Sequence, residues 1–246
     1  MTDTAAVQPQ AIDGKGLAAR LAGVVFSPRA TYADVVARPR ALGVLLVSLL
    51  VMASSSLVFL STDVGKNAVL DQQERTMQNM GIRMNDAQYA QMQARMTSSI
   101  MPAISAVAQV VVIPIVCVIL AGIILAVFNA IMGGNATFKQ AFAVVVHAQW
   151  LSALATLFMY PIDYAKQSLS SPTNLAVFMP FLDEGSFLAR LLGSIDLFRI
   201  WWIVNLAIGI GVLYKRRTSP IATTLLVIYA VIALCIAAIG VAFSGA

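Results

Sequence analysis

An apolar segment near the C-terminus, Asp196–Arg217 (DLFRIWWIVNLAIGIGVLYKRR), constrains the fold of this chain more than any other feature. It begins with an acid, runs through Leu197–Tyr214 with a single base, and ends on three consecutive bases. An apolar run of this length fits the hydrocarbon core of a bilayer, and bases at the end of a span mark its cytoplasmic side. We therefore predict a transmembrane helix here. Six residues are expected to anchor it: Asp196, Trp201, Trp202, Lys215, Arg216 and Arg217.

The overall composition excludes an ordinary soluble globular protein. Of the 246 residues, 59% are hydrophobic and 11% are charged, whereas about 25% of the residues in a soluble domain are charged. The formal net charge of +5 is small, and most of the bases border apolar runs. We attribute this charge to membrane topology and to attraction by lipid headgroups. The expected partner is therefore a lipid bilayer and not nucleic acid.

The apolar residues form blocks of about twenty and not amphipathic stripes, which indicates helices that cross a membrane. We predict an all-α fold: an integral membrane helical bundle with interfacial helices and a polar extramembrane helix. Residues 41–246 are predicted to form the membrane domain. Its five transmembrane helices are predicted at about residues 41–61, 104–132, 141–160, 197–214 and 221–243.

The first forty residues precede the membrane domain and form two parts. Residues 1–14 are small and polar, and we predict a disordered tail. Residues 15–40 are predicted to form cytoplasmic interfacial helices, because their apolar segments are too short to span a bilayer. Ser27 is expected to cap a helix that begins at Pro28, where the missing N–H is not needed. Three charged side chains of this helix are expected to reach water: Arg29, Asp34 and Arg38.

Two long connections, residues 62–103 and 161–196, are predicted to lie on the outer side of the membrane. The first is rich in helix formers and is predicted to form a solvated helix with a methionine stripe. The methionines of this stripe are Met77, Met80, Met84, Met92 and Met96. Methionine is an ordinary apolar filler, but thioethers also suit a soft cation such as Cu(I). Packing is the favoured interpretation, and no metal ligand is assigned.

Five spans place the two termini on opposite sides of the membrane. With the N-terminus inside, nine bases lie inside and seven outside, and three acids lie inside against eight outside. Most of the inner bases crowd the ends of spans, where the positive-inside rule is strongest. We therefore predict a cytoplasmic N-terminus, an outer C-terminus and two outer connections.

Local sequence patterns indicate how the predicted helix at 104–132 packs and where the predicted helix at 141–160 begins. Small residues recur every four positions in the first of them, a spacing that lets membrane helices approach closely. They are Gly122, Ala126 and Ala130. After a Gly-Gly break, Thr137 and Gln140 have the spacing of a capping box, which predicts the start of the next helix.

Polar side chains inside the predicted spans are the candidate functional residues, because such groups are costly in a bilayer. This candidate intramembrane cluster consists of His147, Gln149, Asn129 and Asn205. A proton relay normally needs acids at a similar depth, and no Asp or Glu lies within a predicted span core. We expect a neutral His147 that hydrogen-bonds across the bundle to one of the other three residues.

No pattern in the sequence indicates an enzyme. There is no phosphate-binding P-loop, no GxSxG nucleophile motif and no HExxH zinc motif. We expect no catalytic residue, no metal site and no cofactor.

The order of the segments resembles the Yip family of five-span membrane proteins, and in particular its bacterial branch. One matching feature is the SP-x-x-x-Y segment before the first span (Ser27, Pro28 and Tyr32). Others are the turn GGNATFKQAFAVVVHA between spans two and three and the sequence DLFRIWWIVNLAIGIG that leads into span four. A short basic turn and a last span rich in small residues complete the match, which covers about residues 20–243.

The resemblance implies a five-span bundle in a bacterial cytoplasmic (inner) membrane, which associates with itself or with other membrane proteins. It implies no catalytic residue. Three functional hypotheses follow. The first is a non-enzymatic protein that organises membrane partners or lipids. The second is a small-solute or lipid permease with a polar path near His147, and the third is envelope soft-metal handling through the methionine-rich outer helix.

Overall fold

The structure is a computed structural model that describes residues 14–79, 81–82, 84–183 and 185–244. Within these ranges the regular structure is helical, apart from one isolated β-bridge between Asn174 and Asp196. The predicted all-α class is therefore confirmed. The predicted N-terminal tail lies outside the described residues, except for Gly14.

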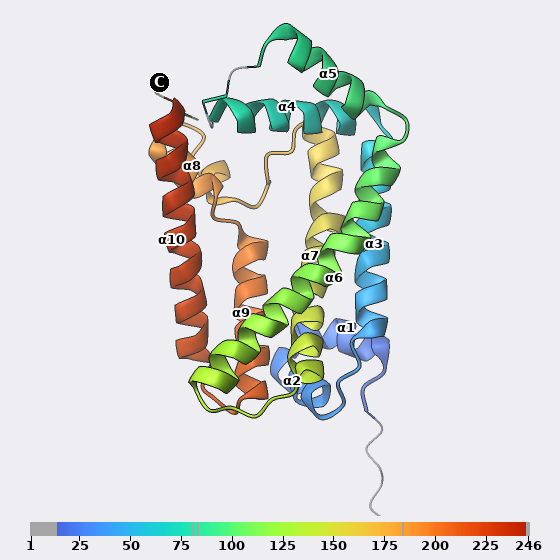
Figure 1. Cartoon of the computed structure of the whole chain (residues 1–246), viewed down its shortest axis with the longest axis vertical. Coiled ribbons are helices and arrows are strands. Elements are labelled where there is room, and N and C mark those ends of the chain that lie inside the picture. Colours follow the sequence, from blue (N-terminus) through green and yellow to red (C-terminus); the bar gives the residue numbers. More distant parts are fainter. Residues whose placement is uncertain (1–13, 80, 83, 184, 245–246) are drawn as a thin grey trace, which may run out of the picture.

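The helices form an elongated bundle that carries shorter helices at both ends (Figure 1). The helices along its axis are α3 (Leu42–Leu60), α6 (Met101–Leu125), α7 (Phe138–Lys166), α9 (Leu197–Leu213) and α10 (Thr218–Ser244). One end, here called the α4 end, carries α4 (Asp63–Asn79), α5 (Asp86–Thr97) and α8 (Phe187–Gly193). The other end, here called the α2 end, carries α1 (Leu17–Phe26), α2 (Pro28–Ala37) and the turns α6–α7 and α9–α10.

Four of the described helices are long and apolar enough to cross a bilayer. They are α3, α6 with its extension to Ile131, α7 and α10. Helix α9 is also apolar but has only 17 residues. At 1.5 Å per residue it is about 26 Å long, against a hydrocarbon core of about 30 Å. The chain is thus an all-α membrane bundle, and the predicted fourth span corresponds to this shorter helix.

The turn between α6 and α7 is built from local hydrogen bonds. The Thr137 side chain accepts a hydrogen bond from the Gln140 backbone N–H at 3.3 Å, and the Gln140 side chain accepts one from the Thr137 N–H at 3.0 Å. The predicted capping box is confirmed. Asn129, in the π-helical turn Ala126–Ile131 that ends α6, donates to the Ala136 carbonyl at 2.7 Å. Because the turn satisfies its own polar groups, α6 and α7 pack as an antiparallel hairpin.

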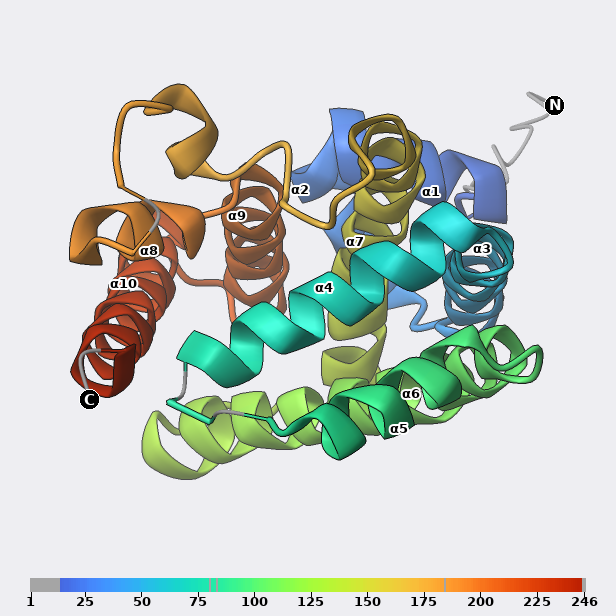
Figure 2. The ribbon, with the colours of Figure 1, turned by 90° about the horizontal axis from the view of Figure 1, so that it is seen from above.

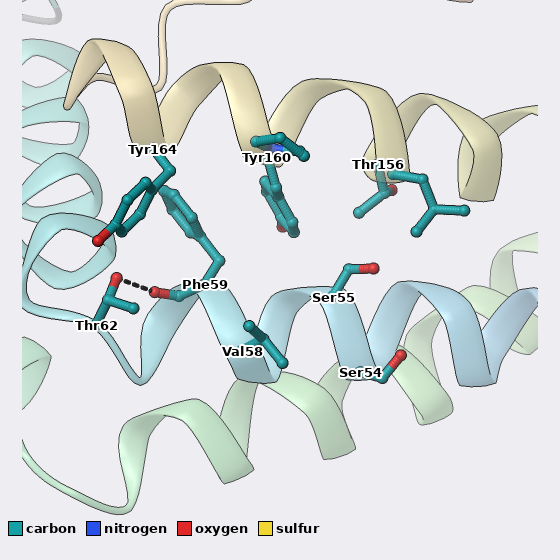
Figure 3. A pocket seen from close by; sticks show the side chains of 10 residues that line it. Ser54, Ser55, Val58, Phe59, Thr62, Thr156, Tyr160 and Tyr164 are labelled. Carbon is teal, nitrogen blue, oxygen red and sulfur yellow. Dashed lines mark hydrogen bonds between the residues drawn. The ribbon is translucent and has the colours of Figure 1, made fainter.

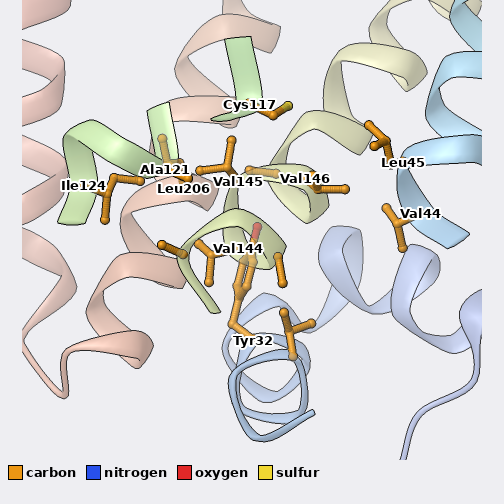
Figure 4. Packing of buried hydrophobic residues seen from close by; sticks show 14 of the residues in the cluster. Tyr32, Val44, Leu45, Cys117, Ala121, Ile124, Val144, Val145, Val146 and Leu206 are labelled. Carbon is orange, nitrogen blue, oxygen red and sulfur yellow. The ribbon is translucent and has the colours of Figure 1, made fainter. Parts of the chain in front are cut away.

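The core surrounds α7, which contacts α3, α6 and α9. Residues 143–148 are all buried, and six consecutive residues cover more than a full turn, so α7 is enclosed on every side at this level. In Figure 4, the Tyr32 side chain of α2 points toward Val144 of α7. Leu45 of α3 and Leu206 of α9 belong to the same cluster. The N-terminal hairpin therefore contributes to the core of the bundle.

The 62–103 connection forms two helices and not the single helix that the methionine pattern predicts. Helix α4 ends at Asn79 and α5 begins at Asp86. Between them Gly81 adopts a φ of 71°, a left-handed conformation that glycine reaches at no steric cost. Asn85 then caps α5 in a capping box with Gln88. The break lets α5 fold back alongside α4.

Helix α4 lies across the end of the bundle and contacts α3 and α10 (Figure 2). Ala68 and Leu70 of this helix are buried. Gly65 marks a close approach, because a Cβ atom there would collide with the Phe59 carbonyl oxygen. The 62–103 connection therefore packs onto the bundle instead of extending away from it.

Candidate functional site

The α1–α2 hairpin is held against α9 by hydrogen bonds between buried groups. The Tyr32 hydroxyl of α2 donates to Asn205 Oδ1 of α9 at 2.6 Å. Asn205 Nδ2 donates to the Val24 carbonyl of α1 at 2.9 Å. Asn205 is 1% exposed and Tyr32 is fully buried, so neither polar group can bond to water instead. The predicted polar residue Asn205 therefore joins three helices.

Tyr32 reaches Asn205 because α9 presents a glycine beside its ring. A Cβ atom at Gly209 would lie 2.6 Å from Val144 Cγ1 and 3.0 Å from Tyr32 Cε1. Burial raises the pKa of the Tyr32 hydroxyl, so it stays protonated and remains a donor. Helix α2 begins at Pro28, as predicted, but the Ser27 side chain makes no capping hydrogen bond.

A buried ion pair joins α1 to α2. Arg20 is 3% exposed, and its Nη2 lies 2.8 Å from Asp34 Oδ2. The guanidinium also donates to the carbonyl oxygens of Arg38 at 3.0 Å and Arg40 at 3.3 Å. The Asp34 side chain is 16% exposed, so it still borders water, as predicted, while it supplies the counter-charge that the buried guanidinium needs. We call these residues the N-terminal lock: Arg20, Val24, Tyr32, Asp34 and Asn205.

The structure does not bring the four residues of the predicted intramembrane cluster together. Asn205 bonds to α1 and α2, and Asn129 bonds within its own turn. His147 is fully buried; its Nδ1 lies 2.7 Å from the Ala143 carbonyl oxygen, and its Nε2 has no partner in the described part of the chain. Gln149 is partly buried on the same helix. The hydrogen bond of His147 is thus made within α7, where the carbonyl four residues earlier is within reach.

Asp196, one of the six predicted anchors, caps α9 and closes a polar junction. Its Oδ1 accepts a hydrogen bond from the Arg199 backbone N–H at 3.1 Å. Its Oδ2 accepts hydrogen bonds from the hydroxyl groups of Ser171 and Thr173, each at 2.6 Å. Burial alone would raise the pKa of this carboxyl, but the hydrogen bonds outweigh burial and lower the pKa below its usual value. Asp196 therefore ties the connection between α7 and α9 to the start of α9.

We expect Asp196→Asn to loosen this junction by about 1.5 kcal/mol, the lower end for a hydrogen bond to a charged group, because Asp196 is only partly buried. Acid should have the same effect on the unmodified chain. The folded-state pKa lies below the usual value of about 3.9. The stabilisation is therefore present above about pH 4 and is lost as the pH falls through the folded-state pKa. Hydrogen exchange at the Leu175 and Leu197 N–H groups, which bond across this junction, measures the change.

Asp183→Asn is the matched control for this experiment, because Asp183 is an exposed acid in the same connection. Its exchange protection is expected to equal that of the unmodified chain. Full protection of both N–H groups in Asp196→Asn at neutral pH would contradict the role assigned to the Asp196 charge.

The other predicted anchors lie toward the two ends of α9. Trp201 lies beside Phe198, with ring centroids 5.9 Å apart. The Trp202 indole N–H is buried and has no hydrogen-bond partner within the described ranges. Lys215–Arg217 forms the exposed turn to α10. Aromatic residues near one end and bases at the other are typical of a membrane-spanning helix.

A groove of about 580 Å³ lies between α3 and α7, toward the α4 end (Figure 3). Its lining is mainly apolar but includes hydroxyl groups from both sides. The hydroxyl-bearing residues are Ser54, Ser55, Thr62, Thr156, Tyr160 and Tyr164. The Phe59 and Tyr160 rings in the lining stack with centroids 4.8 Å apart. Val58 and Leu157 are exposed on the bundle surface, so the groove opens to the outside of the bundle.

A second cavity, of about 330 Å³, lies between α4 and α5. The methionines in its lining are Met77, Met84, Met92 and Met96. The described methionines of the stripe thus lie on α4 (Met77), on α5 (Met92 and Met96) and in the connection between them (Met84), and Met92 is 8% exposed. Met80 lies outside the described residues. Arg95 also lines the cavity, and its positive charge repels a metal cation, which favours packing over Cu(I) binding.

Comparison with known protein families places this chain in one of them. The family described as the Yip1 domain matches residues 22–241, a range that reaches from α1 to α10. No significant match was found among curated proteins, and none among solved structures. The matched range contains four of the five residues of the N-terminal lock and all six predicted anchors.

Proposed function

This chain belongs to the Yip1 domain family, and from that premise we propose that it is a non-enzymatic protein that organises membrane partners or lipids. It is a multi-pass membrane protein that contacts the lipid bilayer through its apolar helices. The partners proposed are other membrane proteins or a second copy of this chain. The location proposed is a bacterial cytoplasmic (inner) membrane.

The observation that carries this proposal is the unequal burial of the long helices. In the apolar 18-residue window of each helix, 44% of the residues are buried in α7, 17% in α6 and 11% in α10. Helices α6 and α10 therefore present most of their apolar surface outward, to lipid or to other helices. The central helix accounts for the cohesion of the bundle, and the outer helices offer surface for association.

One face of α6 favours another helix over lipid tails as its partner. Gly122 has no neighbouring atom within 4 Å of the position that a Cβ atom would take. Ala126 and Ala130 follow at four-residue steps, in the π-helical turn Ala126–Ile131 that ends α6, and are also exposed. Small residues at this spacing let the backbones of two membrane helices come close together. We call this surface the α6 face: Gly122, Ala126 and Ala130.

We expect Gly122→Ile to weaken self-association about fivefold. A branched side chain in the α6 face holds two helices apart, and one interhelical contact in a bilayer contributes about 1 kcal/mol. The fold itself should be unaffected, because no atom lies within 4 Å of the added Cβ. Energy transfer between donor-labelled and acceptor-labelled copies in lipid vesicles measures the associated fraction.

Ala103→Ile is the matched control, since Ala103 is an exposed small residue of the same helix that lies outside the α6 face. It should associate like the unmodified chain. Equal energy transfer in the Gly122→Ile and Ala103→Ile variants would count against the α6 face. Absence of transfer in the unmodified chain would count against self-association as a whole.

The proposed topology has five spans, with the N-terminus in the cytoplasm and the C-terminus outside. The course of α3, α6, α7, α9 and α10 between the two ends of the bundle supports it (Figure 1). The basic turn Lys215–Arg217 lies at the α2 end together with the α1–α2 hairpin. Since bases concentrate on the cytoplasmic side, the α2 end is proposed to face the cytoplasm.

A second candidate function is the binding of a lipid in the groove between α3 and α7. Its volume of about 580 Å³ lies within the range of small-molecule sites. A solute path near His147 has less support. His147 is fully buried and Asn205 is 1% exposed, so neither side chain borders space that holds a water molecule.

A further inference from the structure

A cavity of about 720 Å³ lies at the α2 end, where α2 meets the turn between α9 and α10. Four bases contribute to its lining: Arg29 of α2, and Lys215, Arg216 and Arg217 of the turn. The two segments lie far apart in the sequence, so it is the fold that gathers these charges. The volume is sufficient for a small polar group. We call this cavity the basic pocket.

The positive charge of the basic pocket is not compensated within the described part of the chain. No acid lines it, and the two ion pairs found in this part involve other bases, Arg20 and Lys66. Arg216 donates one hydrogen bond, to the Met132 carbonyl at 3.3 Å. All four bases of the pocket are exposed. Four cations around one cavity create a potential that attracts an anion.

The lining of the basic pocket also suits an anion that has several oxygen atoms. Guanidinium groups donate paired hydrogen bonds to the oxygens of a phosphate. Thr218 and Ser219 line the pocket and begin α10, and the first N–H groups of a helix have no acceptor within it. A phosphate group therefore finds donors from the side chains of the turn as well as from the helix that follows.

The basic pocket lies where the apolar bundle meets the aqueous phase. Helix α10, which is long and apolar enough to cross a bilayer, begins at its edge. Phe26, three residues before Arg29, is 86% exposed. An exposed aromatic ring next to bases is typical of a segment that lies in the headgroup region of a membrane.

We propose that the basic pocket binds the headgroup phosphate of an anionic phospholipid. In this arrangement Arg29 and Lys215–Arg217 hold the phosphate, and the apolar part of α10 that begins at Leu225 lies along the acyl chains. This inference goes beyond the proposed function, because it holds whether or not the chain associates with itself.

Native mass spectrometry of the full chain in a mild detergent tests the pocket. Phosphatidylglycerol serves as the anionic lipid, and phosphatidylcholine with the same acyl chains serves as the neutral one. Arg29→Gln is expected to weaken phosphatidylglycerol binding about fivefold, which is the effect of removing one base at a membrane surface. Binding of phosphatidylcholine should not change.

Lys139→Gln is the matched control, because it removes the same charge from an exposed base at the start of α7 that does not line the pocket. It should bind phosphatidylglycerol like the unmodified chain. Arg217→Gln repeats the test with a base from the other segment and is expected to match Arg29→Gln.

Two results would overturn the proposal. Equal losses in Arg29→Gln and Lys139→Gln would show that binding depends on net charge and not on this cavity. Displacement of phosphatidylglycerol by an equimolar amount of inorganic phosphate would indicate a site for a soluble anion.

Discussion

Replacing Asp34 with asparagine is expected to lower the free energy of unfolding by about 3–5 kcal/mol. The substitution leaves Arg20, which is 3% exposed, without the carboxylate that lies 2.8 Å away. The carbonyl oxygens of Arg38 and Arg40 still accept hydrogen bonds from the guanidinium, but they carry no net charge. A buried cation that has lost both its water and its counter-charge is costly. Thermal unfolding of the purified chain in detergent measures the loss as a lower melting temperature.

The double variant Arg20→Met, Asp34→Leu identifies the cause of that loss. It replaces both charges with apolar side chains of similar size, a change that is often nearly neutral. We therefore expect the double variant to be more stable than Asp34→Asn alone. Asp63→Asn serves as a control, because the Asp63 side chain is 97% exposed. An Asp34→Asn chain as stable as the Asp63→Asn chain would contradict the burial of the ion pair.

Replacing Tyr32 with alanine is expected to cost about 3–5 kcal/mol, because it removes a fully buried ring and leaves a cavity. The ring packs beside Gly209 of α9 and points toward Val144 (Figure 4), and both of these contacts are lost. Tyr32→Phe keeps the ring and removes only the hydroxyl. It leaves Asn205 Oδ1 without its donor, which should cost about 1–3 kcal/mol.

Limited digestion with trypsin gives a second readout for both Tyr32 variants. If the α1–α2 hairpin detaches, Arg20 becomes accessible to the protease, whereas in the docked hairpin it is buried. Phe26→Ala is the control, since Phe26 belongs to the same hairpin but is 86% exposed. A Tyr32→Ala chain that is not cut after Arg20 and melts like the Phe26→Ala chain would show that docking does not depend on Tyr32.

The long helices could be predicted from the sequence because a bilayer acts on each segment separately. The predicted span at 41–61 corresponds to α3, Leu42–Leu60, since apolar length alone decides such a segment. The start of α7 could also be predicted, because Thr137 and Gln140 lie three residues apart in the sequence and hydrogen-bond to each other. Both features depend only on residues that are close in the sequence.

The break between α4 and α5 is also marked in the local sequence, although the methionine spacing favours one continuous helix. Asn85 and Gln88 have the spacing of a capping box, and Gly81 precedes them. A residue pattern that continues at helical intervals does not require a continuous helix, because two helices that fold against each other can share one apolar cavity. The methionines therefore line the space between the helices.

The N-terminal lock could not be predicted, because its partners are remote in the sequence. Tyr32 and Asn205 lie 173 residues apart. A single asparagine in an apolar run indicates that it needs a partner, but only the docking of the hairpin determines which one. Arg20 and Asp34 are closer in sequence, yet their pairing also depends on how α1 folds against α2.

If this chain organises other membrane components, those components should leave the membrane together with it. Identifying the proteins and lipids that are extracted with the chain is therefore the most direct test. Gentle extraction of the unmodified chain from its membrane, followed by native mass spectrometry, records the bound proteins and lipids together. We expect complexes that contain a second copy of the chain or another membrane protein. Isolated monomers, combined with solute flux when those monomers are placed in liposomes, would contradict the claim and indicate a permease.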